Sequence, residues 1–315
     1  MDQPANEASP SANGMGSQLG TIPPEPVFKD IIYEKSGPVA RLIMNRPEKL
    51  NALRVSMFEE LVAGLKRAEA DDDIKVIILK ANGKSFCAGH DLSEVGFVYG
   101  FSDGNTAEDR ARRPSQRARL QFDRKLLEYY MAFMYSMKTV IAQVQGHAVG
   151  GGVYLTEVVD LAIAAEDAQF SHAEQRLMGG GRSLVMNAEI LLLGQKRARE
   201  FLLLGEPISG TRAAEIGLVN KAVPADQLEA ATEEWAMRVA RHPKDALVTG
   251  KVFHQLALDS LGYTSQIWRG YVGHTLGTNL RFEPDEYNYF KHRRDEGARD
   301  AFHSRDRFFE DGTGQ

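Results

Sequence analysis

Three segments of the chain combine residue types that could do chemistry on a carbonyl group. The first runs from Ser85 to Leu92 and the second from Gln145 to Gly152, and each follows a short apolar stretch. The third runs from Phe170 to Glu174 and ends in a carboxylate. Backbone N–H groups from two loops, together with one carboxylate, suit a reaction that puts negative charge on a carbonyl oxygen and moves a proton.

Three consecutive glycines, Gly150 to Gly152, suit the second segment to binding a negatively charged oxygen. Glycine lets a ligand approach the backbone closely. The first turn of the helix expected after it would present free N–H groups, and the helix dipole favours negative charge there. The N–H of His90, next to Gly89, could supply a second donor. A glycine cluster can equally be a turn where side chains would clash, so this pattern alone leaves both interpretations open.

Specific sequences in these segments resemble the two oxyanion-hole segments of the enoyl-CoA hydratase/isomerase (crotonase) family. They are FCAGHDL (86–92) and HAVGGG (147–152). Other stretches agree with the resemblance, namely NRPEKLNAL (45–53), DLAIAAEDAQFSHAE (160–174) and LLLGEPISGTRAAEIGLVNKAVP (202–224). The resemblance implies an α/β fold, a crotonase-like spiral of β-β-α units. It also implies a helical C-terminal oligomerisation region that forms homotrimers or dimers of trimers.

Carried over residue by residue, the resemblance implies an oxyanion hole made by the backbone N–H groups of His90 and Gly151. The expected substrate is an acyl-CoA thioester, so coenzyme A enters as part of the substrate and no cofactor is bound permanently. The side chain of His90 is either a bystander on its loop or a proton donor. The residues that the resemblance assigns to the path of coenzyme A are Ala52, Leu53, Ala88, His90, Asp91, Leu92, Ser93 and Gly151.

One expected carboxylate is missing. Members of the family that add water use two carboxylates, and the first position is occupied here by Tyr154, whereas the second is Glu174. Two carboxylates divide the work of hydration, but one carboxylate can move a proton between carbons, as double-bond isomerisation requires. Hydration is placed first because it is the commoner assignment in the family, and isomerisation second. Decarboxylation or C–C cleavage on the same scaffold stays open. Tyr154 could hold a water, orient a substrate or fill the acyl pocket.

Other titratable residues near these segments have competing interpretations. Glu157 could replace the missing carboxylate, or it could be a solvated or ion-paired helix residue. His147 and His172 are expected to be hydrogen-bonded structural residues, and Cys87 a small buried hydrophobe. No spacing among the eight histidines repeats a recognised ligand pattern, so no metal centre is expected.

The elements that must position these residues divide the chain into three parts. Residues 1–27 are predicted to be a disordered lead-in, 28–225 the spiral core with the coenzyme A and acyl site, and 226–315 a helical trimerisation region with a charged tail. Apolar periodicity predicts helices from about 56 to 70 and from about 120 to 137, and strands at VIILK (76–80), VIAQVQ (140–145) and LAIAA (161–165). Ser209 or Thr211 is a candidate N-cap, and Gly217 a helix stop.

Two basic segments have more than one interpretation. The stretch 93–118 is longer than its counterpart in most relatives and could cover the acyl chain, contact coenzyme A phosphates, or form a solvated or subunit-contact loop. The charged C-terminal tail has the same alternatives, and packing within a trimer is the favoured one. Its arginines are Arg293, Arg294, Arg299, Arg305 and Arg307.

Composition excludes several classes. A net charge of −5 argues against nucleic acid as the main partner, and the single cysteine cannot form an intramolecular disulfide. No long apolar run or secretory signal is present, so we expect a cytoplasmic protein without a membrane partner. The competing class is a catalytically idle protein that binds acyl-CoA or assembles with a partner. Loss of the first carboxylate favours it, and retention of Glu174 disfavours it.

Overall fold

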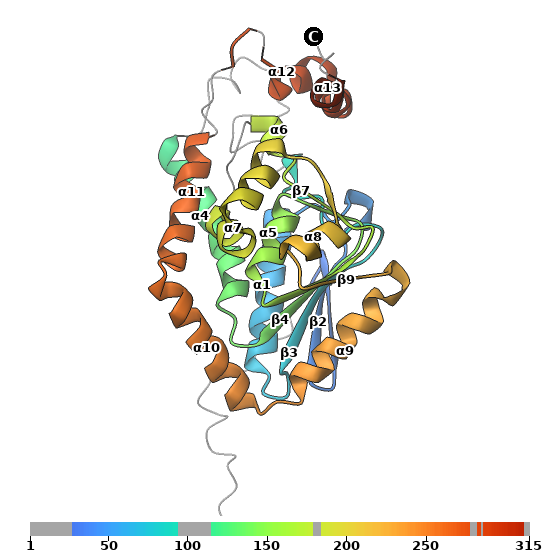
Figure 1. Ribbon diagram of the computed structural model, residues 1–315, viewed down its shortest axis with the longest axis vertical. Coiled ribbons are helices and arrows are strands. Elements are labelled where there is room, and N and C mark those ends of the chain that lie inside the picture. Colours follow the sequence, from blue (N-terminus) through green and yellow to red (C-terminus); the bar gives the residue numbers. More distant parts are fainter. Residues whose placement is uncertain (1–26, 94–114, 179–183, 278–281, 285, 312–315) are drawn as a thin grey trace, which may run out of the picture.

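A computed structural model describes residues 27–93, 115–178, 184–277, 282–284 and 286–311 (Figure 1). Most of the predicted lead-in and most of the 93–118 insertion therefore lie outside the described residues. In the described part of the chain, none of the helices is both long and apolar enough to cross a membrane.

A six-stranded sheet forms the centre of the core, in the order β1-β2-β3-β4-β6-β9. Its first two strands form an antiparallel hairpin that turns at Gly37, where φ is 54°, and the other neighbours are parallel. The bounds are β1 Ile31–Ser36, β2 Val39–Met44, β3 Val76–Ala81, β4 Thr139–Val144, β6 Leu161–Ala165 and β9 Lys221–Val223.

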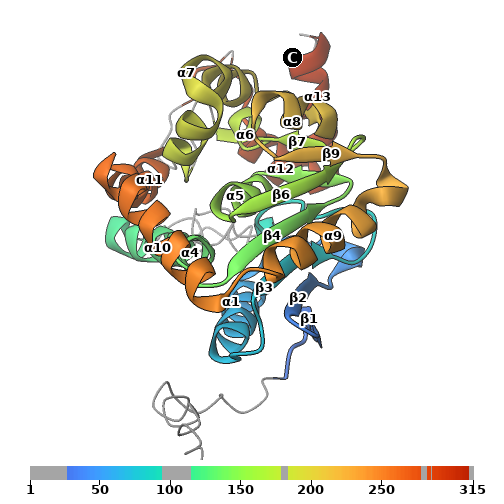
Figure 2. The same cartoon turned by 60° about the horizontal axis from the view of Figure 1, so that its bottom comes forward.

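Alternate side chains of the sheet face two different helix layers. Val76 and Ile78 of β3 pack with α9 (Leu228–Ala240) on one face, whereas Ile77 and Leu79 join the main core on the other. The helices on that second side are α1 (Val55–Ala70), α4 (Gln116–Met134), α5 (Gly151–Val158) and α8 (Gly210–Ile216) (Figure 2). Because both faces are covered, the strands are almost continuously apolar.

A second, three-stranded sheet lies at the end of the parallel strands and carries the segments of interest. It contains β5 (His147–Val149), β7 (Gln169–Ser171) and β8 (Ile208–Ser209), in the order β5-β7-β8. The chain passes from β4 to β5 at Gly146, whose φ is 56° and where a side chain would collide with the carbonyl of Lys84. Glycine is therefore required at this crossing.

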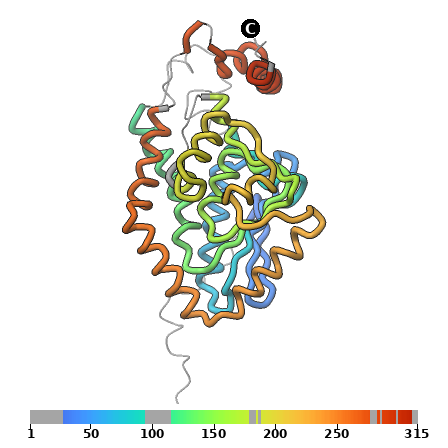
Figure 3. The backbone as a smooth tube through the Cα atoms, viewed as in Figure 1, coloured from blue at the N-terminus to red at the C-terminus, as the bar shows by residue number. Residues whose placement is uncertain are grey.

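The C-terminal third is helical, as the sequence predicts. Helices α10 (Lys244–Ser260) and α11 (Tyr263–Gly277) continue from α9, and α11 packs against α4 and against α7 (Met186–Leu204). Helices α12 (Tyr289–Glu296) and α13 (Ala298–Asp311) lie at the end of the molecule that also holds α6 (Gln175–Met178) (Figure 3). The remaining elements are two short 3-10 helices, Pro47–Lys49 and Ala225–Gln227.

Most element predictions are confirmed, with one correction. The helix expected from about 120 begins earlier, at Gln116, because the hydroxyl of Ser115 caps it by accepting from the N–H of Ala118, and it ends at Met134. Ser209 is the N-cap of α8, and Gly217 ends it in the left-handed region. Within α7, Gly194 has non-helical backbone angles (φ 74°, ψ 159°), so a kink separates two helical stretches.

Candidate functional site

Backbone pairing brings the first two predicted segments together. Cys87 and Ala148 form a parallel bridge, in which the N–H of Cys87 donates to the carbonyl of His147 and the N–H of Val149 donates to the carbonyl of Cys87, both at 2.9 Å. The N–H of Gly150 donates to the carbonyl of Ser171 at 2.9 Å and so ties in the third segment. Three stretches far apart in the sequence therefore meet at one place.

Two backbone N–H groups, those of His90 and Gly151, lie at this meeting place. Among the described residues, no protein acceptor is recorded for the N–H of His90 or of Gly151. The two loops are close, since a Cβ atom built on Gly89 would lie 3.7 Å from the nitrogen of Gly151. Gly89 and Gly150 have φ of 91° and 50°, so both positions favour glycine. The arrangement can offer two hydrogen bonds to one oxygen atom.

His90 and Gly151 both line a pocket of about 140 Å³. The core contributes the residues of the predicted site, and the C-terminal helices contribute a second set. Among the described residues, the lining is Ala88, Gly89, His90, Leu92, Val149, Gly150, Gly151, Tyr154, Ala173, Glu174, Leu177, His274, Tyr289, Phe290, Arg293, Phe302 and Arg305.

Glu174 is the acidic residue of this pocket, and its carboxylate has two hydrogen-bond partners. The hydroxyl of Tyr154 donates to its Oε1 at 2.6 Å, and Nδ1 of His172 lies 2.9 Å from the same atom. Burial by itself would raise the pKa of Glu174, but the neighbouring His172 and the Tyr154 hydroxyl outweigh it and hold the pKa below its usual value. Glu174 is therefore ionised at neutral pH and can accept a proton.

The side chain of His90 is held in a neutral state. Its Nε2 lies 2.8 Å from the hydroxyl of Tyr130, and the ring borders the pocket. Burial lowers the pKa of His90 to about 4, so the imidazole is uncharged at neutral pH. Of the two roles left open by the sequence, donation by an imidazolium is disfavoured.

The other residues assigned to the coenzyme A path fall into two groups. Ala88 and Leu92 line the pocket, but Ala52, Leu53, Asp91 and Ser93 do not. Leu53 is buried, and its N–H donates to the carbonyl of Gly89 at 2.7 Å. Asp91 forms an ion pair with Arg46 at 3.1 Å and accepts from the hydroxyl of Ser93 at 2.6 Å. These contacts stabilise the loop that presents the N–H of His90.

Comparison with known proteins agrees with this geometry. The family model for enoyl-CoA hydratase/isomerase matches residues 34–262. This chain belongs to the enoyl-CoA hydratase/isomerase family.

Relatives in this family include EchA13 of Mycobacterium tuberculosis, whose name assigns it only provisionally as an enoyl-CoA hydratase. It is 29% identical over 281 residues, which are 82% of this chain and 87% of that protein. An enoyl-CoA hydratase/isomerase from Xanthobacter autotrophicus Py2 superposes with a TM-score of 0.76 at 32% identity, covering 89% of this chain and 98% of its own. An enoyl-CoA hydratase from Mycobacterium smegmatis gives 0.76 at 28% identity, covering 91% and 97%. The expected crotonase-like α/β fold with a helical C-terminal region is thus confirmed.

Several residues in the pocket of this family member, or in contact with its lining, were missed by the sequence reasoning. Tyr130 of α4 holds His90, and its position within a helix pattern gave no signal. Arg293 and Arg305 were noted only as part of a basic tail, and nothing in their spacing indicated that α12 and α13 border the pocket. The aromatic residues from the same helices are Tyr289, Phe290 and Phe302.

Glu157 is buried, which corrects the expectation of a solvated residue but not that of an ion-paired one. It is not among the described residues that line the pocket, so its role as a replacement for the missing carboxylate gains no support. It is 5% exposed and lies beside His172 and Glu189, which are both fully buried. Burial by itself would lower the pKa of His172, but Glu189 and Glu174 outweigh it and raise the pKa well above its usual value. His147 is exposed on β5, and Cys87 is buried as expected.

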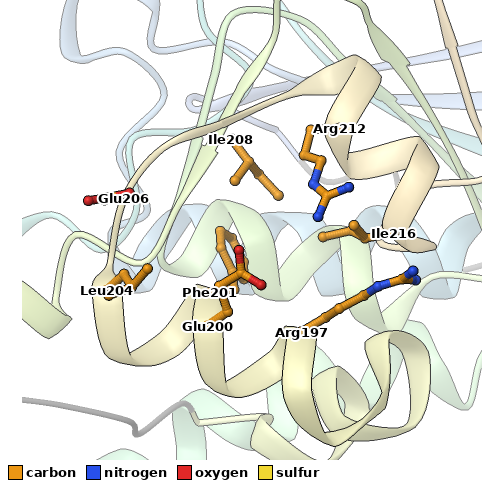
Figure 4. Close-up of a pocket in the computed structure, with 8 residues that line it drawn as sticks. All are labelled: Arg197, Glu200, Phe201, Leu204, Glu206, Ile208, Arg212 and Ile216. Carbon is orange, nitrogen blue, oxygen red and sulfur yellow. The ribbon is translucent and has the colours of Figure 1, made fainter.

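A second pocket, of about 50 Å³, lies between α7 and the segment that leads into α8 (Figure 4). Its polar residues are all charged, and the others are apolar. The charged ones are Arg197, Glu200, Glu206 and Arg212, and the apolar ones are Phe201, Leu204, Ile208 and Ile216. None of the predicted site residues lines it, so the first pocket is the candidate active site.

Proposed function

We propose that this chain is an acyl-CoA-processing enzyme that stabilises a thioester enolate with the N–H groups of His90 and Gly151 and transfers a proton with Glu174. The observation that carries the proposal is that His90, Gly151 and Glu174 line one pocket, and that the N–H groups of His90 and Gly151 have no acceptor among the described residues. Coenzyme A would enter as part of the substrate. Each backbone donor would lower the barrier by about 2.7–4 kcal/mol.

Double-bond isomerisation of a 3-enoyl-CoA is the reaction that the pocket favours. Glu174 is the one carboxylate among the described residues that line it. Its carboxylate would take a proton from C2 to form a dienolate, whose oxygen accepts from the two N–H groups. It would then return the proton to C4 and leave a 2-enoyl thioester. This order differs from the one based on the sequence, in which hydration came first, because Glu157 is not among the described residues that line the pocket and so supplies no second carboxylate there.

Hydration of a 2-enoyl-CoA is the second candidate. The hydroxyl of Tyr154, 2.6 Å from Glu174, supports it because the pair could hold a water whose oxygen adds to C3. The names of the Mycobacterium smegmatis and Xanthobacter autotrophicus proteins include this activity. Glu174 alone would then have to accept the proton of the water and supply one to C2.

A panel of 2-enoyl- and 3-enoyl-CoA thioesters, straight-chain and aromatic, separates these reactions. Appearance of 2-enoyl absorbance from a 3-enoyl substrate indicates isomerisation, and its loss from a 2-enoyl substrate in water indicates hydration. Glu174→Gln should lower kcat by about 10²–10⁴-fold, because a neutral amide cannot carry the proton. The matched control is Glu166→Gln, at an exposed position, which should leave kcat unchanged.

Full turnover by Glu174→Gln would reject Glu174 as the proton carrier. Acyl-CoA binding by calorimetry without turnover of any substrate would favour the idle-protein class, and turnover of other thioesters would favour decarboxylation or C–C cleavage.

Assembly into homotrimers or dimers of trimers is part of the same proposal. Apolar side chains are exposed on α7 and on the α10–α11 pair, which suits burial against another copy. They include Leu191, Leu203, Leu204, Phe253, Leu256, Leu261 and Leu276. Sedimentation equilibrium would give the stoichiometry, and a monomer would contradict the proposal. The cytoplasmic location stays a prediction, to be checked by fractionation.

A further inference from the structure

Three buried titratable side chains lie directly behind Glu174. They are Glu157 of α5, His172 after β7 and Glu189 of α7, which are 5%, 0% and 0% exposed. One ligand atom from each lies within 4.8 Å of the others. None of the three lines the pocket, so the proposed proton transfer does not use them.

Five polar atoms of this cluster have no hydrogen-bond partner among the described residues. They are both carboxylate oxygens of Glu157, both of Glu189, and Nε2 of His172. Buried carboxylates are strongly destabilising unless a hydrogen-bond donor or a cation compensates them. The two carboxylates converge on Nε2 of His172, and a metal cation among the three side chains would compensate both of them; without an ion, a protonated His172 beside Glu189 is the compensating cation.

The orientation of His172 suits a metal ligand. Its Nδ1 lies 2.9 Å from Oε1 of Glu174, and a proton on Nδ1 leaves the lone pair of Nε2 directed at the cluster. Metal-bound histidines commonly donate their other ring N–H to a carboxylate in this way. Oxygen Oε1 of Glu189 is 2.7 Å from Nε2, but the two atoms do not satisfy the geometry of an N–H···O hydrogen bond.

The 2.7 Å distance between Nε2 of His172 and Oε1 of Glu189 is shorter than the separation of two ligand atoms on one metal ion. Two atoms bound to one ion at about 2.0–2.2 Å each, at a right angle or wider, lie about 3 Å or more apart. The 2.7 Å contact must therefore open by a few tenths of an ångström. A proton shared between His172 and Glu189 is the competing occupant.

We propose that Glu157, His172 and Glu189 bind one divalent first-row transition-metal ion of the Zn²⁺ type. One imidazole nitrogen with carboxylate oxygens is a donor set that such ions accept, and three protein ligands leave a fourth position open. The ion would fix the His172 ring so that Nδ1–H keeps donating to Glu174. It would act on the pocket only by positioning Glu174, and the inference does not depend on which reaction the pocket performs.

The test uses the full chain without an affinity tag, stripped with a chelator and then dialysed against Zn²⁺ or Mn²⁺ at pH 8. Elemental analysis should find one ion per chain. Glu157→Gln and Glu189→Gln, which keep the side-chain size, should each weaken binding in calorimetry by on the order of 100-fold or more, since changes outside the ligand shell alone cost 10–100-fold. Glu166→Gln, at an exposed position, is the matched control and should bind like the unaltered chain.

Two results would overturn the inference. The first is no stoichiometric ion in the unaltered, folded chain after either dialysis, with Glu157→Gln raising the melting temperature, as a shared proton predicts. The second is an ion retained equally in both glutamine variants, which would place it elsewhere. Circular dichroism checks that each variant is folded. Glu174→Gln should lose turnover but keep the ion, so failure of the proposed function and failure of the metal site are distinguishable.

Discussion

The two walls of the pocket are built by different means. The backbone wall, residues 88–90 and 149–151, presents main-chain N–H groups fixed by strand-like pairing and by glycines of positive φ. The carboxylate wall, Tyr154 and Glu174, presents side chains whose charge depends on the residues behind them. Main-chain donors cannot be removed by changing their own side chain, whereas the carboxylate wall changes with single substitutions. One fold can therefore keep its oxyanion donors while its proton chemistry varies.

The backbone wall can be broken at a glycine, and after Glu174→Gln this change should give the largest effect. A Cβ atom at Gly151 would lie 2.7 Å from the hydroxyl of Tyr130 and 3.1 Å from both the His90 ring and Leu53. Gly151→Ala should therefore displace the Gly151 N–H and lower kcat by about 10²–10³-fold, the effect of losing one such donor. Steady-state kinetics on the best thioester of the panel measures it.

The control is Gly250→Ala in α10, where a Cβ atom would meet no atom within 4 Å. It should leave kcat unchanged and slightly raise the melting temperature, because alanine is the better helix former. Equal kcat in both variants would mean that the Gly151 N–H does not contact the reacting oxygen.

The same contrast explains what the sequence could predict. The backbone wall requires glycine where φ is positive and where loops cross closely, so its residue types are specific and their order is recognisable. The strands and helices beneath it were predictable because both sheet faces are buried and the apolar periods are clear.

The carboxylate wall was predictable only in part. Glu174 and Tyr154 came from the family resemblance, but Glu157 and Glu189 are common helix residues 32 positions apart, and only the packing of α5 against α7 brings them together. For the same reason, no local sequence pattern indicated that residues of α12 and α13 line the pocket. Long-range packing, rather than any residue pattern, decides which tail residues reach the pocket.

Acid titration would sharpen the comparison, because His90 on the backbone wall is buried in its neutral form. The unfolded chain binds a proton at His90 below about pH 6.5, whereas the folded chain does so only near its pKa of about 4. The free energy of unfolding should therefore fall as the pH drops from 6.5 to 4, by up to about 3 kcal/mol, and the fall should level off below that. The partial exposure of the ring to the pocket makes this an upper bound.

Some charged neighbours lower the pKa of His90 and others raise it, so the control variant must isolate the contribution of His90. Besides burial, His274 disfavours the imidazolium, whereas Glu174 and Asp123 favour it. Urea unfolding of the unaltered chain and of His90→Gln at pH 7, 5.5 and 4.5 gives the difference, and only the unaltered chain should lose this part of its stability. Parallel curves for the two proteins would show that His90 titrates normally.

The mildest change on the carboxylate wall is Tyr154→Phe, which should give the smallest effect. It keeps the buried ring, which is 3% exposed, and removes only the hydroxyl that donates to Glu174 at 2.6 Å. A hydrogen bond to a charged group contributes about 1.5–3 kcal/mol, so kcat should fall by roughly 10- to 150-fold, with KM little changed. Tyr129→Phe is the matched control, since its hydroxyl also donates to a carboxylate, that of Glu59, but outside the pocket. Because an aromatic filler would tolerate the loss of its hydroxyl, unchanged kcat in Tyr154→Phe would assign Tyr154 to shaping the acyl pocket and leave His172 as the residue that orients Glu174.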